Sequence, residues 1–297
     1  MKPRVVWLIL CLIWGSTWLF IKLGLQDLPP FTFAGIRFVI SSAILFAIIK
    51  IRGIRLPRKR SDWMLLAVTG VLSFSLNYGA VFWGEQRITS GLAAVLQATI
   101  PVFGLVIAHF YLPSERMTLP KILGVIMGVA GVAVIFSDQL SVAGPSALAG
   151  SAAVVVGAAC AAYANVLVKA RGGNMEPAIL AGAQMVFGLI PLLAAGWFLE
   201  RGTFYFRWTT LAVVCLLYLA IVGSVIAFLL YYWLVQNMDV TNTMLVALVT
   251  PVIAVAVGMV FLNEELNWRL FVGGLMIISG IGMIVIRRGK SMQERAS

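Results

Sequence analysis

Ten runs of about 20 apolar residues limit what this chain can fold into. An α-helix needs about 20 mainly apolar residues to cross the hydrocarbon layer of a bilayer. The chain is 61% hydrophobic and 11% charged, whereas soluble globular domains carry roughly 25% charged residues. The sequence therefore predicts an all-α membrane protein with ten transmembrane helices. The runs cover residues 5–24, 31–51, 63–83, 91–111, 120–137, 147–168, 177–198, 210–233, 242–262 and 268–286.

The distribution of basic residues predicts the orientation. Cytoplasmic loops of membrane proteins collect Lys and Arg. With both termini inside, outer loops receive only Arg87, Arg201, Arg207 and Arg269 of the 22 basic residues, and Lys22 and Arg37 lie within helices. We therefore predict an inner (plasma) membrane protein with both termini cytoplasmic. The net charge of +11 then reflects topology and contact with membrane lipid, and predicts no nucleic-acid partner.

Similar residues recur in the two halves of the chain, which indicates an internal duplication. Each unit contains five predicted helices, and because five is odd, the second unit must enter the bilayer from the opposite side. We predict two inverted five-helix repeats around a central cavity, residues 1–137 and 147–287, followed by a cytoplasmic tail, 288–297. Inverted repeats are typical of secondary transporters. The matched pairs are Trp83/Trp233, Gln86/Gln236, Pro101/Pro251, Glu115/Glu265 and Gly124/Gly274 at an offset of 150, and Lys22/Lys169, Pro30/Pro177 and Gly35/Gly182 at 147.

Several short motifs resemble those of the drug/metabolite transporter superfamily, closest to its ten-helix EamA type. The motifs are Trp14-Gly15-Ser16-Thr17-Trp18, Thr99-Ile100-Pro101, Thr250-Pro251, Leu112-Pro113-Ser114-Glu115 and Leu262-Asn263-Glu264-Glu265. The resemblance implies a basket of helices one to four and six to nine, braced by helices five and ten. It implies a cavity lined by helices one, three, four, six, eight and nine, and export of amino acids and related metabolites or uptake of small solutes. The chain departs from the family in Pro113-Ser114-Glu115, where a Gly usually precedes the Glu.

Two prolines are predicted to form hinges. Pro101 and Pro251 lie near the middle of helices four and nine, where proline lacks the N–H that would bond the carbonyl four residues back, at Gln97 or Ala247. Such kinks can expose polar groups to a ligand and allow bending. The alternative is a static kink whose carbonyls bond to neighbouring side chains.

Polar and aromatic residues within the predicted helices are candidates for substrate binding. Amide and hydroxyl groups would lack partners if they faced lipid, so we expect them to turn inward, toward substrate or toward neighbouring helices. For Trp18, anchoring in the interfacial aromatic belt competes with this role. The candidates are Trp14, Thr17, Trp18, Arg37, Asn77, Tyr78, Gln97, Tyr163, Asn165 and Thr250.

Arg37 is the most unusual candidate, because a permanent charge inside a helix is costly unless it is paired or solvated. It could hold a substrate carboxylate through a bidentate contact. It could also extend toward the membrane surface or pair with Glu85.

Glu115 is predicted to cap a helix or fix a loop rather than transfer protons, and His109 to be a packed or interfacial residue. A small-residue face formed by Gly124, Gly128 and Gly131 is predicted to permit close helix contact.

The absence of certain residues narrows the function. No Asp or Glu lies deep within a predicted helix, which argues against proton-coupled antiport of cationic drugs. The sequence also lacks a metal-binding His/Glu cluster and a phosphate-binding Gly-rich loop, so we predict no catalytic residue, no metal and no cofactor.

The prediction is a secondary transporter that exports small neutral or zwitterionic metabolites, such as amino acids, by alternating access. Drug or multidrug efflux, a channel and an intramembrane enzyme are the alternatives, and both a monomer and a homodimer remain open.

Overall fold

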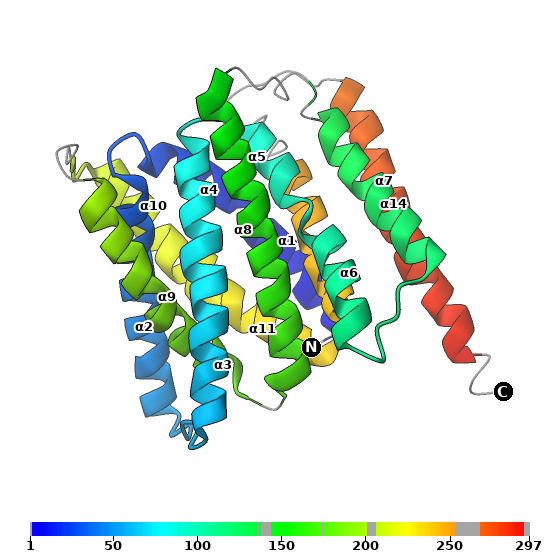
Figure 1. The fold of residues 1–297 in the computed structure, drawn as a ribbon, viewed down its shortest axis with the longest axis horizontal. Helices are drawn as coiled ribbons and strands as arrows, with labels where there is room; N and C mark the ends of the chain where they lie inside the picture. The colour runs from blue at the N-terminus through cyan, green and yellow to red at the C-terminus, as the bar shows by residue number, and fades with distance from the viewer. Residues whose placement is uncertain are drawn as a thin grey trace.

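The computed structural model describes residues 2–88, 90–135, 137, 144–173, 175–200, 206–253 and 268–293, which are almost entirely helical (Figure 1). Six helical stretches are long and apolar enough to cross a membrane: Pro3–Gly24, Pro30–Ile51, Arg60–Glu85, Gly144–Arg171, Pro177–Leu199 and Thr210–Asn237. Shorter apolar stretches cover Val95–Tyr111, Leu119–Val134, Val240–Ile253 and Phe271–Ile281. Each stretch falls on one predicted span, so the predicted fold class is confirmed. The end of the predicted ninth span lies outside the described residues.

The first half of the chain forms five predicted spans from eight helical elements. These are α1 (Pro3–Gly24), α2 (Pro30–Ile51), α3 (Arg60–Gly70), η1 (Val71–Asn77), α4 (Tyr78–Glu85), α5 (Ser90–Gln97), α6 (Ile100–Tyr111) and α7 (Leu119–Ile135). Both α1 and α2 have a proline in the first turn, where its missing N–H breaks no helical hydrogen bond.

The second half repeats this order. It contains α8 (Gly144–Arg171), α9 (Pro177–Leu199), α10 (Thr210–Ala220), η3 (Ile221–Ile226), α11 (Ala227–Asn237), α12 (Val240–Met244), a further helical segment over 246–253 and α14 (Trp268–Gln293). Proline again begins α9, as it begins α2.

Spans three and eight each contain a π-helical segment, which the sequence did not predict. The two segments, η1 and η3, begin at Val71 and Ile221, which are related by the same offset of 150 as the sequence repeat. A π-turn carries one extra residue and is common at functional sites. The local widening of the helix is therefore a property of the repeat unit.

Spans four and nine differ from the continuous, proline-kinked helices that we expected. Span four consists of two helices, because α5 ends at Gln97 and α6 begins at Ile100, which places Pro101 in the first turn of α6. Span nine is interrupted at Leu245, six residues before Pro251. Proline is well accommodated in a first turn and poorly in a helix interior, which explains the break before Pro101. The two interruptions do not lie at repeat-equivalent positions.

Spans five and ten lie together at one edge of the bundle, where α7 and α14 run side by side (Figure 1). Their contact depends on glycine: a Cβ on Gly124 would lie 2.5 Å from the carbonyl oxygen of Gly280, and a Cβ on Gly131 would lie 2.6 Å from that of Gly273. The predicted small-residue contact is confirmed. Outward-facing apolar side chains such as Phe271 and Ile278, each about 70% exposed, are suited to lipid.

Contacts between connectors define the two ends of the bundle. At one end, the backbone N–H of Arg207 donates to the Asp27 carbonyl, 3.1 Å away, just before α2 begins. At the opposite end of α2, Ile54 and Pro57 line a groove together with Met175, whose carbonyl accepts a bond from the Gln236 amide. Residues 60 and 207 therefore lie at opposite ends of the helices.

Candidate functional site

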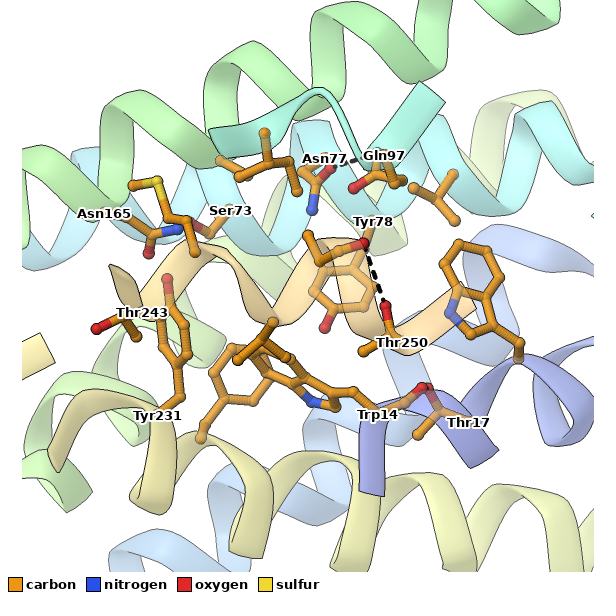
Figure 2. Close-up of a pocket in the computed structure, with 18 of the residues that line it drawn as sticks. Trp14, Thr17, Ser73, Asn77, Tyr78, Gln97, Asn165, Tyr231, Thr243 and Thr250 are labelled. Carbon is orange, nitrogen blue, oxygen red and sulfur yellow. Dashed lines mark hydrogen bonds between the residues drawn. The ribbon is translucent and has the colours of Figure 1, made fainter. Parts of the chain in front are cut away.

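A central cavity of about 150 Å³ lies between the two halves (Figure 2). A cavity of this size in a protein interior can hold a molecule such as benzene. Its lining comes from the six spans that the family resemblance implied, together with span two. The lining residues are Trp14, Thr17, Trp18, Ile21, Arg37, Ser73, Asn77, Tyr78, Val81, Gln97, Ile100, Ala161, Asn165, Phe228, Tyr231, Tyr232, Thr243, Met244, Val246, Ala247 and Thr250.

Most residues selected from the sequence as substrate-binding candidates meet at this cavity. The ones that line it are Trp14, Thr17, Trp18, Arg37, Asn77, Tyr78, Gln97, Asn165 and Thr250. Tyr163 does not, and its hydroxyl lies 3.2 Å from that of Tyr111 in an exposed position. Residues two apart in a helix point about 200° apart around its axis, so Tyr163 and Asn165 cannot face the same space.

Two buried amide side chains connect spans three and four across the cavity wall. Gln97 Nε2 donates to Asn77 Oδ1 at 3.1 Å and to the Val154 carbonyl at 3.3 Å. This bond fixes the orientation of the Asn77 amide, whose nitrogen points into the cavity (Figure 2). Asn77 closes the π-helical segment η1, so the wide turn helps to place it there.

Thr250 connects the cavity to the predicted hinge at Pro251. Its hydroxyl donates to the Ala247 carbonyl at 3.5 Å, which is the carbonyl that Pro251 cannot bond (Figure 2). The static-kink alternative, in which a side chain satisfies this carbonyl, is therefore present in span nine. Pro101 lies in the first turn of α6, next to Ile100, which lines the cavity.

Aromatic rings form much of the remaining wall. The Trp14 ring lies 5.4 Å from that of Phe228 and 5.1 Å from that of Tyr231, and its Nε1 donates to the Gly223 carbonyl at 3.3 Å. Five further lining residues were not among those predicted from the sequence: Ser73, Phe228, Tyr231, Tyr232 and Thr243. The repeat offset of 150 relates Tyr78 to Phe228, so comparison of the halves could have identified that residue.

Arg37 is 1% exposed, so it does not extend toward the membrane surface. Its Nε donates to Ser224 Oγ at 2.7 Å and its Nη2 to the Gly223 carbonyl at 3.1 Å. These two partners belong to η3, so Arg37 joins α2 to span eight. The predicted alternative of pairing with Glu85 is wrong, because the guanidinium bonds to Ser224 and Gly223 instead and Nη1 has no hydrogen-bond partner.

Glu115 fixes a loop, as predicted, but its partner lies in the other half of the chain. The buried carboxylate accepts bonds from the backbone N–H groups of Val240 and Thr241 and from the Thr241 hydroxyl. It therefore caps the N-terminus of α12. His109 accepts a bond from the Met117 backbone N–H at Nδ1, which is a loop contact.

Among the residues that the structure describes, no group of three or more His, Cys, Asp or Glu side chains is placed to hold a metal ion. The lining of the cavity likewise contains no Asp or Glu.

Comparison with known proteins identifies the family. The model of the EamA-like transporter family matches residues 3–137 and 148–286, one match for each five-helix repeat of this ten-helix membrane fold. The chain is 30% identical to an uncharacterised transporter, YoaV, of Bacillus subtilis (strain 168), over 92% of each protein. It is 30% identical to an uncharacterised inner membrane transporter, YedA, of Escherichia coli (strain K12), over 87% of this chain and 82% of the relative.

A solved crystal structure with 19% sequence identity has the same fold, with a TM-score of 0.81 over 97% of this chain and 98% of that one. The family and its named relatives are transporters rather than enzymes, and the apolar helices make the chain an integral membrane protein. On these matches, the chain is a member of the EamA-like transporter family.

Proposed function

We propose that this protein is a secondary transporter that exports small neutral or zwitterionic metabolites, such as amino acids, by alternating access. The observation that carries the proposal is the central cavity, to which both halves of the chain contribute residues. A site shared by two similar units can be opened toward either side when one unit rocks against the other.

The proposed inversion of the two units supports this mechanism. Each unit has five spans, and the connector at residue 60 lies at the opposite end from that at residue 207. We propose that both termini face the cytoplasm, as the distribution of basic residues predicts, in an inner (plasma) membrane.

The composition of the cavity supports a small polar solute. Amide and hydroxyl groups from Asn77, Asn165 and Thr243 supply hydrogen bonds, while Trp14 and Tyr231 supply apolar contact. Ligand sites commonly combine apolar walls with a few polar groups of this kind. Because the lining has no carboxylate, it offers nothing to neutralise a cationic drug.

Purified protein in liposomes is expected to exchange an amino acid or related metabolite down its gradient and to show counterflow of labelled solute. A carrier that alternates between two sides returns loaded faster than empty, which produces counterflow and saturation. The measurement is uptake of labelled amino acids into liposomes preloaded with the same unlabelled solute. A flux that rises linearly with concentration, without counterflow, would contradict alternating access and favour a channel.

A further inference from the structure

Arg37 is a buried charge with no acidic counterpart among the residues that the structure describes. The side chain is 1% exposed and lines the central cavity, and among the described residues it forms no ion pair with an acidic group. Its other neighbours are two aromatic side chains: the guanidinium carbon lies 5.3 Å from the Phe38 ring centroid and 5.2 Å from that of Tyr78, whose polar side chain also interacts electrostatically with the guanidinium. An unpaired charge in such a setting is costly, so a binding partner for it would be strongly favoured.

Only some of the N–H donors of the Arg37 guanidinium have hydrogen-bond partners. Ser224 and the Gly223 carbonyl engage Nε and Nη2, which fixes the plane of the group. Nη1 is buried and has no hydrogen-bond partner. A rigid guanidinium with unused N–H donors at a cavity is suited to an anionic oxygen acceptor, above all a carboxylate.

The other repeat shows that the structural task of this position does not need a charge. Arg37 lies seven residues after Pro30 in α2, and the equivalent position in α9, seven residues after Pro177, is Gln184. Gln184 is fully buried, donates to Thr69 Oγ1 at 2.6 Å and accepts a bond from the Tyr232 hydroxyl. A neutral amide thus joins span seven to spans three and eight with both of its polar atoms bonded, and it lies outside the cavity lining.

We infer that Arg37 binds the carboxylate group of the transported solute and is the main determinant of specificity in the cavity. That the bound solute is also transported rests on the proposed function. Its binding to Arg37 can be measured without transport. One carboxylate would neutralise the single charge of the lining, whereas the matching amide would leave that charge unpaired.

Four solutes of similar size test separately whether the carboxylate group and the amino group of a solute contribute to binding. L-Alanine and L-lactate carry a carboxylate, L-alaninamide and L-lactamide carry an amide in its place, and each pair differs in the amino or hydroxyl group. Binding to the purified full chain in detergent is followed by calorimetry. We expect each acid to bind about 10- to 100-fold more tightly than its amide, the range for a hydrogen bond to a charged group.

Two substitutions of Arg37 test its role directly. Arg37→Gln introduces the residue of the other repeat and is expected to abolish the preference for acid over amide. Arg37→Lys keeps the charge and is expected to retain part of that preference. Gln184→Met is the matched control, which should lower thermal stability and leave the preference unchanged. A merely structural Arg37 would change acid and amide binding equally.

The outcomes separate this inference from the proposed function. Equal binding of acid and amide by the unmodified protein, binding of neither acid, or an unchanged preference in Arg37→Gln would overturn the role of Arg37. A preference for acids that Arg37→Gln removes, in a protein that shows no counterflow with either acid, would keep the role of Arg37 and overturn transport. Tight binding of lactate without alanine would support the carboxylate site and contradict amino acids as the substrates.

Discussion

Replacing Ala247 by phenylalanine is expected to reduce solute exchange to the level of protein-free liposomes while the helices remain folded. Ala247 is half-buried and lines the central cavity. The new ring is about the size of benzene, which a cavity of 150 Å³ can hold, so the side chain would occupy the space that the solute needs. Counterflow in liposomes measures the effect.

The matched control is Ala152→Phe. Ala152 is exposed on α8 and does not line the cavity, so a ring there should point away from it. Both variants should unfold thermally near the temperature of the unmodified protein, and only Ala247→Phe should lose exchange. Normal exchange by folded Ala247→Phe would show that solute does not pass through this cavity.

Removing the carboxylate of Glu115 is expected to lower the stability of the protein more than any other substitution proposed for it. Glu115 is 1% exposed and accepts bonds from two backbone N–H groups and one hydroxyl at the start of α12. Glu115→Ala would leave these buried donors without an acceptor, at a cost of about 3 kcal/mol or more in the free energy of unfolding. Thermal unfolding of the purified protein in detergent measures the loss as a lowered midpoint.

Glu176→Ala is the control for Glu115. Glu176 precedes α9 in the N-cap position, but it is exposed and its side chain makes no capping bond. Its removal should change stability little. If both variants unfolded at the same temperature, the contact between Glu115 and α12 would not contribute to the stability of the bundle.

The sequence was sufficient to predict the ten spans, because lipid requires long apolar helices whatever their partners are. It also identified most cavity residues whose side chains are polar. Asn77, Gln97 and Asn165 stand out in apolar helices, and avoidance of lipid leaves them only the interior. The energetic cost of exposing a polar side chain to lipid is therefore enough to place these residues in the interior of the bundle.

Other features of the structure depend on contacts between distant parts of the chain, which a local sequence pattern does not reveal. A cavity-facing Phe228 and a lipid-facing Phe271 have the same hydropathy, so the sequence cannot separate them. The π-helical segments arise from a backbone register that apolar composition does not determine. Glu115 was correctly expected to fix a loop, but its partners at Val240 and Thr241 come from the other repeat.

The break in span four has a local cause, the proline at position 101. The sequence predicts that Pro101 kinks a continuous helix, whereas in the structure a new helix begins at Ile100, after the turn at residues 98–99, and Pro101 lies in its first turn. Both arrangements accommodate proline, so the local sequence does not decide between them. In the structure, α6 packs against α8 and α12.

Labelling of a single cysteine at position 165 tests most directly whether one cavity is reached from both sides of the membrane. Cys11, Cys160 and Cys215 are first replaced by alanine, and Asn165→Cys is added, because Asn165 lines the cavity. A membrane-impermeant thiol reagent is then applied to vesicles of either orientation. The account predicts labelling from each side, with protection by transported solute in both cases. Labelling from one side only, whatever solute is present, would contradict it.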